Sequence, residues 1–327
     1  MKISLLAFLR CGSPAVDKSS RTNPYWFGSK SYHKTPLYES NPVSYWTGRD
    51  DNKKLSFRHV KPCKLGGDND SDVGRSNTTV LFLNGLLSNM NGTKCNALQR
   101  HCTKNGVSFL CFDYRGHGQS SGHFIDCTMH DWVGDASDML EHVISLGKEQ
   151  QQEANVILIG SSLGAWISLV LAMKRPDVIT AVIGIGSAID YTSDTYKDKL
   201  TDEQRAMWEN SVGSSSTSNI FEVSSPYLDD AYPFTRDLYQ SGNDYLICQD
   251  HHYFEGIANR QLRCPVRFLH GSEDEVIHFQ KIYDVANALQ SKYSATDISI
   301  KLLKGGDHRL SRADDIQAIL DTLDEFL

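Results

Sequence analysis

One stretch of the chain decides its fold: Ile157-Leu158-Ile159-Gly160-Ser161-Ser162-Leu163-Gly164-Ala165. The apolar residues up to Ile159 are typical of a buried parallel strand, and a helical pattern begins at Leu163. Between them stands Gly-x-Ser-x-Gly, the pattern of a nucleophile elbow, in which a strained turn pushes the serine hydroxyl out at the carboxyl end of the sheet. We therefore expect Ser162 to be a covalent nucleophile. The alternative is a Gly/Ser-rich turn between strand and helix that carries no chemistry.

A serine on such an elbow needs an acid further along the chain, and then a histidine. The residues from Cys264 to Leu269 predict a short strand, and Gly271 opens a loop at its end. Three residues beyond this glycine lies Asp274, which we choose as the acid. Its neighbours Glu273 and Glu275 remain alternatives, because two of these three acids can simply be solvated.

The histidine is predicted at position 308. Residues Ile298 to Leu303 alternate as a strand, and the strand runs into a loop from Lys304 to Arg309 before a helix begins near Ser311. A general base is expected on a loop of this kind, at the end of a strand. Asp307 is adjacent to His308 and is expected to be a neighbour rather than the acid of the triad.

Chemistry assigns a role to each of the three side chains. A serine hydroxyl is a poor nucleophile at neutral pH, so His308 must take the proton of Ser162 during attack. Asp274 would hold the imidazole in the required tautomer and stabilise the imidazolium that forms.

The tetrahedral intermediate needs two donors for its oxyanion. One is the backbone N–H of Leu163, the residue after the nucleophile. The other is expected from the loop after an early strand, which we predict at Thr79 to Leu83. We assign this second donor to the N–H of Leu86, where Gly85 permits the tight turn.

A second loop follows the strand predicted at Phe109 to Phe112. Its glycines and serines, between Asp113 and Gly122, require a tight and irregular path. We interpret His117 in this loop as a structural residue rather than a catalytic one. Thr128 then caps a helix, with Asp131 at the capping-box position.

The order of these motifs resembles the α/β-hydrolase superfamily from about Lys54 to Leu327. The resemblance implies a mostly parallel central sheet flanked by helices, with Ser162, Asp274 and His308 as the catalytic triad. Within the superfamily, several runs are similar to one narrow branch of mitochondrial palmitoyl-protein thioesterases, also described as acyl-glucuronide esterases. These runs are Ser88–Lys94, Phe112–Tyr114, Gly160–Gly164, Asp250–His252 and Leu269–Gly271.

The chain departs from that branch at positions close to the expected site. The branch has a proline before the oxyanion-loop glycine and an aromatic residue after it, where this chain has Asn84 and Leu86. Ala165 replaces a second glycine after the elbow, and the segment from Tyr191 to Asp244 is longer. These differences leave the chemistry in place and bear on the substrate.

The expected hydrolase domain covers residues 41–327, with a helical lid insertion at about residues 190–260. One clear helix is predicted there, from Thr201 to Asn210. The insertion is rich in aromatic residues, which could line an acyl-binding wall or, for most of them, only pack the lid onto the main domain. They are Phe221, Tyr227, Tyr232, Phe234, Tyr239, Tyr245, Tyr253 and Phe254.

Residues 1–40 are expected to be a transit peptide or a disordered leader. Up to Tyr38 the only acid is Asp17, against six Lys or Arg residues, which is the composition of a mitochondrial targeting segment. A mitochondrial location is therefore predicted. Cytoplasmic and secreted locations remain alternatives, since Asn77 and Asn91 begin triplets that match glycosylation acceptors.

The composition of the chain limits the kinds of partner that it is expected to bind. With 327 residues, 40% of them hydrophobic, the chain can bury a large core, and its net charge of -7 argues against nucleic acid. No apolar run is long enough to predict a transmembrane segment. The eight cysteines are scattered, so neither a metal site nor any cofactor is predicted. The oligomeric state cannot be read from the sequence.

Together these observations predict a serine hydrolase that cleaves acyl thioesters through an acyl-serine intermediate, and that removes palmitoyl groups from protein cysteines. The alternative is a carboxylesterase that acts on small esters, lipid esters or acyl glucuronides, because all of these substrates form the same intermediate. A binding protein that keeps the fold without catalysis is disfavoured by the intact order of serine, acid and histidine.

Overall fold

The computed structural model describes residues 42–48, 53–61, 77–149, 153–210, 220–227, 231–249 and 261–327. The leader predicted at residues 1–40, the Asp250–His252 run, Tyr253 and Phe254 lie outside this described part. Its strands are β1 (Ser44–Thr47), β2 (Lys54–Val60), β3 (Thr78–Leu83), β4 (Ser108–Phe112), β5 (Asn155–Ser161), β6 (Ile179–Ile185), β7 (Ile220–Val223), β8 (Tyr232–Thr235), β9 (Val266–Gly271) and β10 (Ile298–Leu303). Its helices are α1 (Thr93–Lys104), a short 3-10 helix η3 (Phe124–Asp126), α2 (Met129–Glu149), α3 (Leu163–Lys174), α4 (Tyr191–Lys199), α5 (Asp202–Asn210), α6 (Arg236–Asn243), α7 (Gln280–Tyr293) and α8 (Ala313–Asp324).

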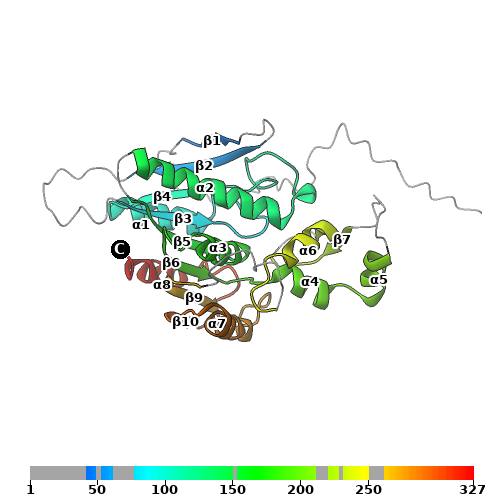
Figure 1. Cartoon of the computed structure of the whole chain (residues 1–327). Helices are drawn as coiled ribbons and strands as arrows, with labels where there is room; N and C mark the ends of the chain where they lie inside the picture. The colour runs from blue at the N-terminus through cyan, green and yellow to red at the C-terminus, as the bar shows by residue number, and fades with distance from the viewer. Residues whose placement is uncertain are drawn as a thin grey trace, which may run out of the picture. The chain divides into compact units, whose positions relative to one another are not determined.

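Eight strands form one sheet in the order β1-β2-β4-β3-β5-β6-β9-β10 (Figure 1). The pairs β1–β2 and β2–β4 are antiparallel, and every later pair in this order is parallel. The parallel strands β3, β5 and β6 are almost wholly buried, as expected for strands that helices cover on both faces. The carboxyl ends of the parallel strands therefore meet at one edge, where ligands and catalytic groups gather in sheets of this kind.

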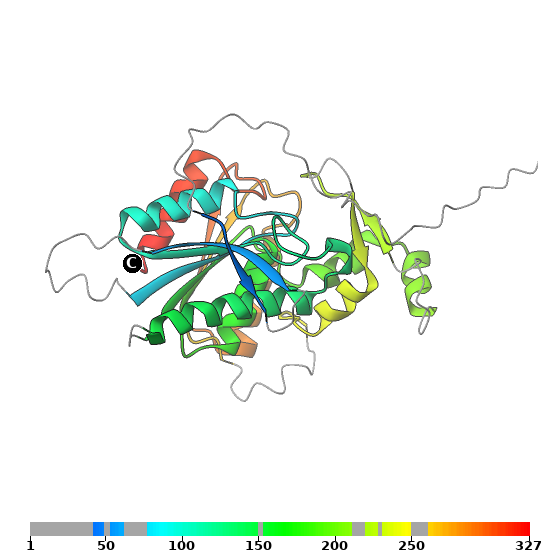
Figure 2. The ribbon, with the colours of Figure 1, turned by 90° about the horizontal axis from the view of Figure 1, so that it is seen from above.

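Helices cover both faces of the sheet (Figure 2). On one face, α2, α3 and α7 pack on strand residues such as Leu81 and Leu158, and on the other, α1 and α8 pack on residues such as Phe82 and Ile159. Neighbouring strand residues point to opposite faces, so each buried strand contributes side chains to the hydrophobic core on either face of the sheet. The predicted architecture, a mostly parallel sheet flanked by helices, is confirmed.

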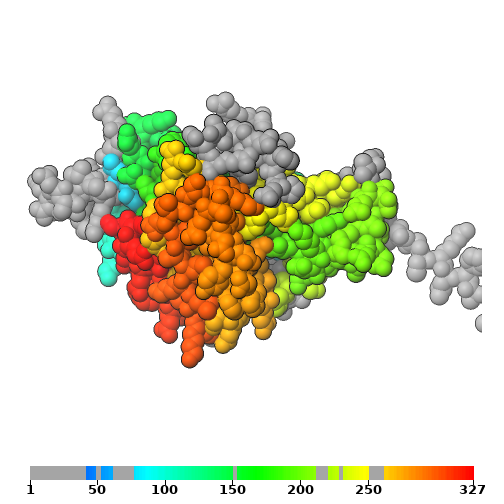
Figure 3. Space-filling model, turned by 60° about the horizontal axis from the view of Figure 1, so that its bottom comes forward, coloured from blue at the N-terminus to red at the C-terminus, as the bar shows by residue number. Residues whose placement is uncertain are grey.

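The chain between β6 and β9 forms an insertion that contains α4, α5, the β7–β8 hairpin and α6. Only α5 was predicted, with Thr201 as its cap, and the Thr201 hydroxyl accepts from the N–H of Gln204. The carboxylate of Asp190 is buried and accepts from the N–H groups of Ile247 and Cys248, so it ties the start of the insertion to its end. In Figure 3 the insertion (green to yellow, at the right) lies beside the orange part of the C-terminal elements.

The aromatic side chains of the insertion pack largely against one another. Tyr196 stacks on Tyr239 with ring centroids 4.1 Å apart, and Trp208 lies next to both Phe221 and Phe234. These contacts favour the interpretation that most of the rings build a small core within the insertion. Tyr227 is different, because its contacts are with His308 and Arg309.

The protein should lose stability in mild acid because of His59 on β2. Burial, together with the neighbouring charges of His142 and Lys61, lowers the pKa of His59 to about 4. A histidine with a lowered pKa stabilises the fold above its ordinary pKa of 6.5, and this contribution is lost as the pH falls toward 4. Between pH 7 and pH 4.5 the free energy of unfolding should fall by about 2 kcal/mol more in the wild type than in His59→Gln. Urea titrations at both pH values measure this difference, and equal losses in the two proteins would contradict it.

Candidate active site

The elbow predicted around Ser162 is formed where β5 passes into α3. Ser162 has φ 53° and ψ −116°, a backbone conformation that side chains other than glycine rarely adopt. A Cβ on Gly160 would lie 2.3 Å from the carbonyl carbon of Gly164, and one on Gly164 would lie 2.2 Å from the carbonyl oxygen of Leu83. Both positions therefore require glycine. The strained turn leaves Ser162 half-buried between a buried Ser161 and a buried Leu163.

The structure brings Ser162, His308 and Asp274 together, although they are far apart in the sequence. The Ser162 Oγ lies 3.0 Å from Nε2 of His308, and the His308 Nδ1 lies 2.8 Å from Oδ2 of Asp274. Ser162 follows β5, Asp274 follows β9 and His308 follows β10, so the three side chains meet at the carboxyl edge of the sheet. The alternatives Glu273 and Glu275 are exposed, and neither contacts His308 in the described part of the chain.

The loop after β9 holds the Asp274 carboxylate in place. Its Oδ1 accepts from the backbone N–H groups of Val276 and Ile277, at 2.9 and 2.8 Å. Burial alone would raise the pKa of Asp274, but the hydrogen bond with His308 and the N–H of Ile277 outweigh it, and the pKa lies below its usual value. The carboxylate is therefore ionised at neutral pH and faces Nδ1 of His308.

His270, at the carboxyl end of β9, supports the same carboxylate and was given no role from the sequence. Its Nε2 lies 2.7 Å from the carbonyl oxygen of Ile277 and 3.3 Å from Oδ2 of Asp274. Burial lowers the pKa of His270, so the ring is neutral near pH 7. The carbonyl contact requires the proton to be on Nε2, so this N–H donates to the carbonyl oxygen of Ile277 and lies close to the Asp274 carboxylate. The position of His270, four residues before an acid at a strand end, is the signal that could have found it.

The loop after β3 carries Leu86 past the nucleophile. A Cβ on Gly85 would lie 3.2 Å from Cβ of Ser162, so the loop backbone passes directly beside the elbow. Among the described residues, no group accepts a hydrogen bond from the N–H of Leu86 or of Leu163. Both amides are thus free to bind a ligand oxygen. Asn84, where the resembling branch has proline, donates its side-chain N–H to the carbonyl oxygen of Phe112 at 2.8 Å.

Asp113 joins this loop to the one that follows β4. Its Oδ1 accepts from the N–H of Met90 at 2.7 Å, and its Oδ2 accepts from the N–H of Gln119 at 3.0 Å. Gly118 runs so close that a Cβ would lie 2.0 Å from Asp113 Oδ2. His117 is buried in the same loop, with Nδ1 at 3.0 Å from the carbonyl oxygen of Arg115. The loop is a packed scaffold beneath the Leu86 segment.

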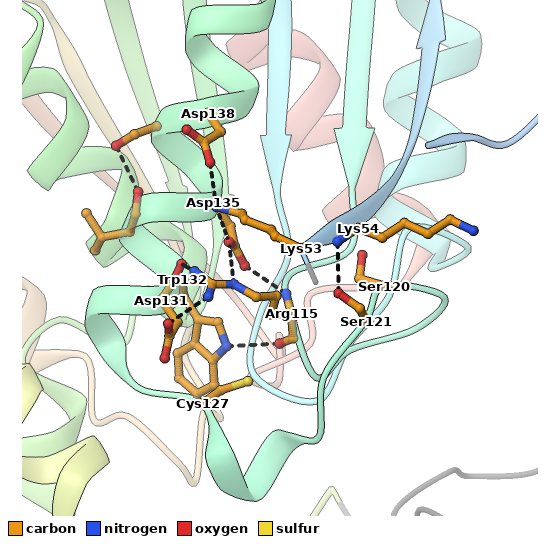
Figure 4. Close-up of polar contacts among 12 residues, drawn as sticks. Lys53, Lys54, Arg115, Ser120, Ser121, Cys127, Asp131, Trp132, Asp135 and Asp138 are labelled. Carbon is orange, nitrogen blue, oxygen red and sulfur yellow. Dashed lines mark hydrogen bonds and ion pairs between the residues drawn. The ribbon is translucent and has the colours of Figure 1, made fainter. Parts of the chain in front are cut away.

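Charged side chains bind Arg115 in the loop that follows β4 (Figure 4). The carboxylate of Asp135, on α2, is fully buried and accepts from the N–H and the guanidinium of Arg115, each at 2.8 Å. Lys53 lies 2.8 Å from the same carboxylate, and Arg115 also pairs with Asp131. Asp131 in turn accepts from the N–H of Thr128, as predicted for the capping box at the start of α2.

Nothing in the described part of the chain points to a bound metal or a membrane span. No group of three or more His, Cys, Asp or Glu side chains there could hold a metal ion. Within the same ranges, no helix has both the length and the apolar composition to cross a bilayer. The His251-His252 pair of the sequence lies outside these ranges.

Comparison with known proteins shows that this chain is similar to hydrolases. Residues 74–220 match the family model described as serine aminopeptidase, S33. The chain is 31% identical to the "Palmitoyl-protein thioesterase ABHD10, mitochondrial" of Mus musculus over 248 residues, which cover 76% of this chain and 74% of that protein. The protein of the same name from Bos taurus is 27% identical over 315 residues, covering 96% of this chain and 87% of its own length.

Solved structures agree with these matches. The mouse alpha/beta hydrolase domain-containing protein 10 superposes with a TM-score of 0.68 at 27% identity, covering 87% of this chain and 98% of that chain. A putative hydrolase from Agrobacterium vitis superposes with a TM-score of 0.69, also at 27% identity and with the same coverage. Both superpositions extend well beyond the elbow, over most of the chain.

Proposed function

We propose that this chain, a serine hydrolase that belongs to the α/β-hydrolase family of the palmitoyl-protein thioesterase ABHD10, removes fatty acyl groups from cysteine thioesters of proteins. The observation that carries the hydrolytic chemistry is the unbroken chain of contacts from Asp274 through His308 to Ser162, at 2.8 and 3.0 Å, on a strained elbow. The choice of protein thioesters among the possible acyl substrates rests on the similarity to the palmitoyl-protein thioesterase of Mus musculus. The two free amides of Leu86 and Leu163 beside it support an oxyanion hole.

The acylation step follows from this geometry. The Ser162 Oγ attacks the thioester carbonyl carbon while Nε2 of His308 takes the hydroxyl proton. The carbonyl oxygen becomes an oxyanion and accepts hydrogen bonds from the N–H groups of Leu86 and Leu163. Asp274 stabilises the imidazolium. When the carbon–sulfur bond breaks, His308 returns the proton to the leaving sulfur, which departs as a thiol and leaves an acyl-serine ester.

Deacylation repeats the same chemistry with water. His308 takes a proton from a water molecule that attacks the acyl carbon, and the oxyanion again forms beside Leu86 and Leu163. His308 then protonates the Ser162 Oγ as the ester bond breaks. The products of deacylation are a fatty acid and the free enzyme. Each turnover therefore consumes one water molecule, releases one thiol and one fatty acid, and returns the proton to Ser162.

The insertion between β6 and β9 is proposed as the lid that holds the acyl chain. It reaches the site through Tyr227, whose hydroxyl accepts from the backbone N–H of His308. It is also anchored to the main body by the ion pair between Asp194 on α4 and Lys281 on α7, at 2.9 Å. Because most of its aromatic rings pack together, the chain-binding surface is expected near Tyr227 and the partly buried Leu86 and Leu87 rather than along the whole insertion.

Activity should rise with acyl-chain length on thioester substrates. Each methylene buried in an apolar channel contributes about 0.8 kcal/mol, so kcat/KM should grow by roughly fourfold per methylene until the channel is full. Matched S-acyl and O-acyl substrates of graded length measure this, with Ser162→Ala as the blank. A flat length profile, with small esters or acyl glucuronides cleaved far better than long-chain thioesters, would contradict the proposal and favour a general carboxylesterase.

We also propose that the protein is mitochondrial. The relatives from mouse and cattle carry that location in their names. The residues up to Tyr38 contain six Lys or Arg residues and a single acidic residue, which is typical of a mitochondrial targeting segment. A fluorescent protein fused behind residues 1–40 should enter mitochondria in transfected cells, as judged by co-localisation and by a shortened product on gels. Diffuse cytosolic fluorescence, or export of the full chain with a glycan on Asn77, would refute the proposal.

A further inference from the structure

Tyr227 binds the main chain of His308. The Tyr227 hydroxyl oxygen accepts a hydrogen bond from the backbone N–H of His308 at 3.1 Å, although the two residues are 81 positions apart. The two rings also lie close, with centroids 5.8 Å apart. Tyr227 is half-buried and belongs to the insertion, whereas His308 belongs to the loop after β10. One side chain of the insertion thus contacts the backbone of the residue that faces Ser162.

Arg309 strengthens the same connection from the other direction. Its guanidinium lies over the Tyr227 ring, 5.0 Å from the centroid, and donates to the carbonyl oxygen of Tyr227 at 2.6 Å. Tyr227 is therefore held to the dipeptide His308-Arg309 through its hydroxyl, its ring and its backbone carbonyl. A planar guanidinium suits both a ring face and a carbonyl, which a lysine ammonium could not match as well.

Other residues hold the remaining sides of this dipeptide. The side chain of Lys94, from the Ser88–Lys94 run, donates to the carbonyl oxygen of Arg309. Gly186, with φ 52°, passes so close that a Cβ there would lie 2.6 Å from the carbonyl oxygen of His308. Lys94 thus binds one carbonyl group and Gly186 passes close to the other, whereas Tyr227 is the described residue that accepts from the His308 N–H.

We propose that Tyr227 is a positioning residue: its hydroxyl fixes the backbone of His308 so that Nε2 stays within reach of the Ser162 Oγ. This inference rests on the proposed roles of Ser162 and His308. It assigns the insertion a part in the chemistry in addition to any contact with substrate.

The physical reason lies in the tolerance of the reaction for misplacement. Proton transfer needs Nε2 within hydrogen-bonding distance of the Ser162 Oγ, and a shift of about 1 Å in a reacting group can cost up to about a hundredfold in rate. Without the hydroxyl, the N–H of His308 would lose its partner in a half-buried place and would move to find another. Burial raises the pKa of Tyr227, so the hydroxyl is neutral and keeps its own proton throughout the catalytic pH range.

Tyr227→Phe removes only the hydroxyl and keeps the ring under Arg309, so it isolates this bond. We expect kcat per active site to fall by about tenfold and KM to change by less than about twofold, for a soluble acyl ester such as a p-nitrophenyl ester. Active sites are counted by complete labelling with a fluorophosphonate. The rate of that labelling should fall by the same factor, because it needs the same base but no substrate binding.

Tyr239→Phe is the matched control. Tyr239 also belongs to the insertion, but among the described residues its hydroxyl has no hydrogen-bond partner, and its ring stacks on Tyr196. Its kcat and labelling rate should stay within about twofold of the wild type. A purely structural role for the Tyr227 hydroxyl would reduce the number of labelled sites and the melting temperature, and would leave kcat per site unchanged.

Two results would overturn the inference. One is a kcat per site within twofold of the wild type in Tyr227→Phe, and the other is a raised KM with unchanged kcat, which would make Tyr227 a substrate contact. If Tyr227→Phe does not fold, Arg309→Lys takes its place. A fluorophosphonate labelling rate in Arg309→Lys equal to that of the wild type would also refute the positioning role of Tyr227. Ser162→Ala is run alongside: full activity in that variant would refute the proposed nucleophile itself, while an inactive Ser162→Ala with an unaffected Tyr227→Phe would refute only the role of Tyr227.

Discussion

Ser162→Ala should lower kcat by about 10⁴-fold or more and abolish labelling by a fluorophosphonate, because without the oxygen neither the acyl-serine nor the phosphonyl-serine bond can form. The variant should still fold. No hydrogen bond from the Ser162 side chain caps α3, and alanine carries the same Cβ as serine at this strained position. The residual rate would come from the oxyanion donors and binding alone.

Ser161→Ala is the control for this variant, since it removes a hydroxyl from the adjacent residue. Ser161 is buried, and no contact between its hydroxyl and His308 is present. It should keep both turnover and labelling. Intact-mass spectrometry after labelling measures the outcome directly, because only the variant that keeps the nucleophile gains the mass of one label. A labelled and active Ser162→Ala protein would refute the assignment of the nucleophile.

The parts of the fold that local patterns specify could be predicted from the sequence. The strands β3, β4 and β10 match the predicted ranges to within one residue, and the strand β5 passes into the helix α3 at Leu163 as predicted. Each is either an apolar run bounded by turn residues or a regular alternation. The insertion was predicted less well, since α4, α6, β7 and β8 are only four to nine residues long, and such short segments give a weak pattern in the sequence.

The residues of the candidate site that directly follow strands could be predicted from the sequence. The choice of the acid could not be settled in the same way, because it depends on the conformation of a loop. Ser162 and His308 each follow a recognisable strand at a glycine-rich turn, so topology alone brings them to one edge of the sheet. The choice among Glu273, Asp274 and Glu275 depended on which side chain turns inward. Asp274 accepts from the N–H groups two and three residues ahead, as short aspartate side chains do in Asx turns. That preference for Asp over Glu was a usable signal.

Contacts between distant segments carried no signal in a single sequence. The hydrogen bond between Tyr227 and the His308 backbone joins an insertion to a loop 81 residues later. Nothing in the residues around Tyr227 distinguishes it from the other aromatic residues of the insertion. Its role depends on how the insertion folds back on the sheet, which tertiary packing decides and local propensity does not.

Asp274→Asn should lower kcat by about 10⁴-fold, the size of effect known when a triad aspartate becomes asparagine in a serine protease. In the wild type, Oδ1 of Asp274 accepts from the N–H groups of Val276 and Ile277, while Oδ2 faces Nδ1 of His308. An asparagine must keep its oxygen toward the two backbone donors, because its NH₂ group cannot accept. The NH₂ group then points at Nδ1 of His308.

This orientation reverses the hydrogen bonds along the triad. Facing a donor, Nδ1 of His308 must be the acceptor, so its proton moves to Nε2. The imidazole then presents an N–H to Ser162 and cannot take its proton, which is why the loss should appear in kcat and in fluorophosphonate labelling alike. Glu273→Gln and Glu275→Gln are matched controls, since each neutralises an exposed acid next to Asp274. Both should keep activity within about threefold of the wild type. An active Asp274→Asn beside an inactive Glu273→Gln or Glu275→Gln would transfer the role of the acid to that glutamate.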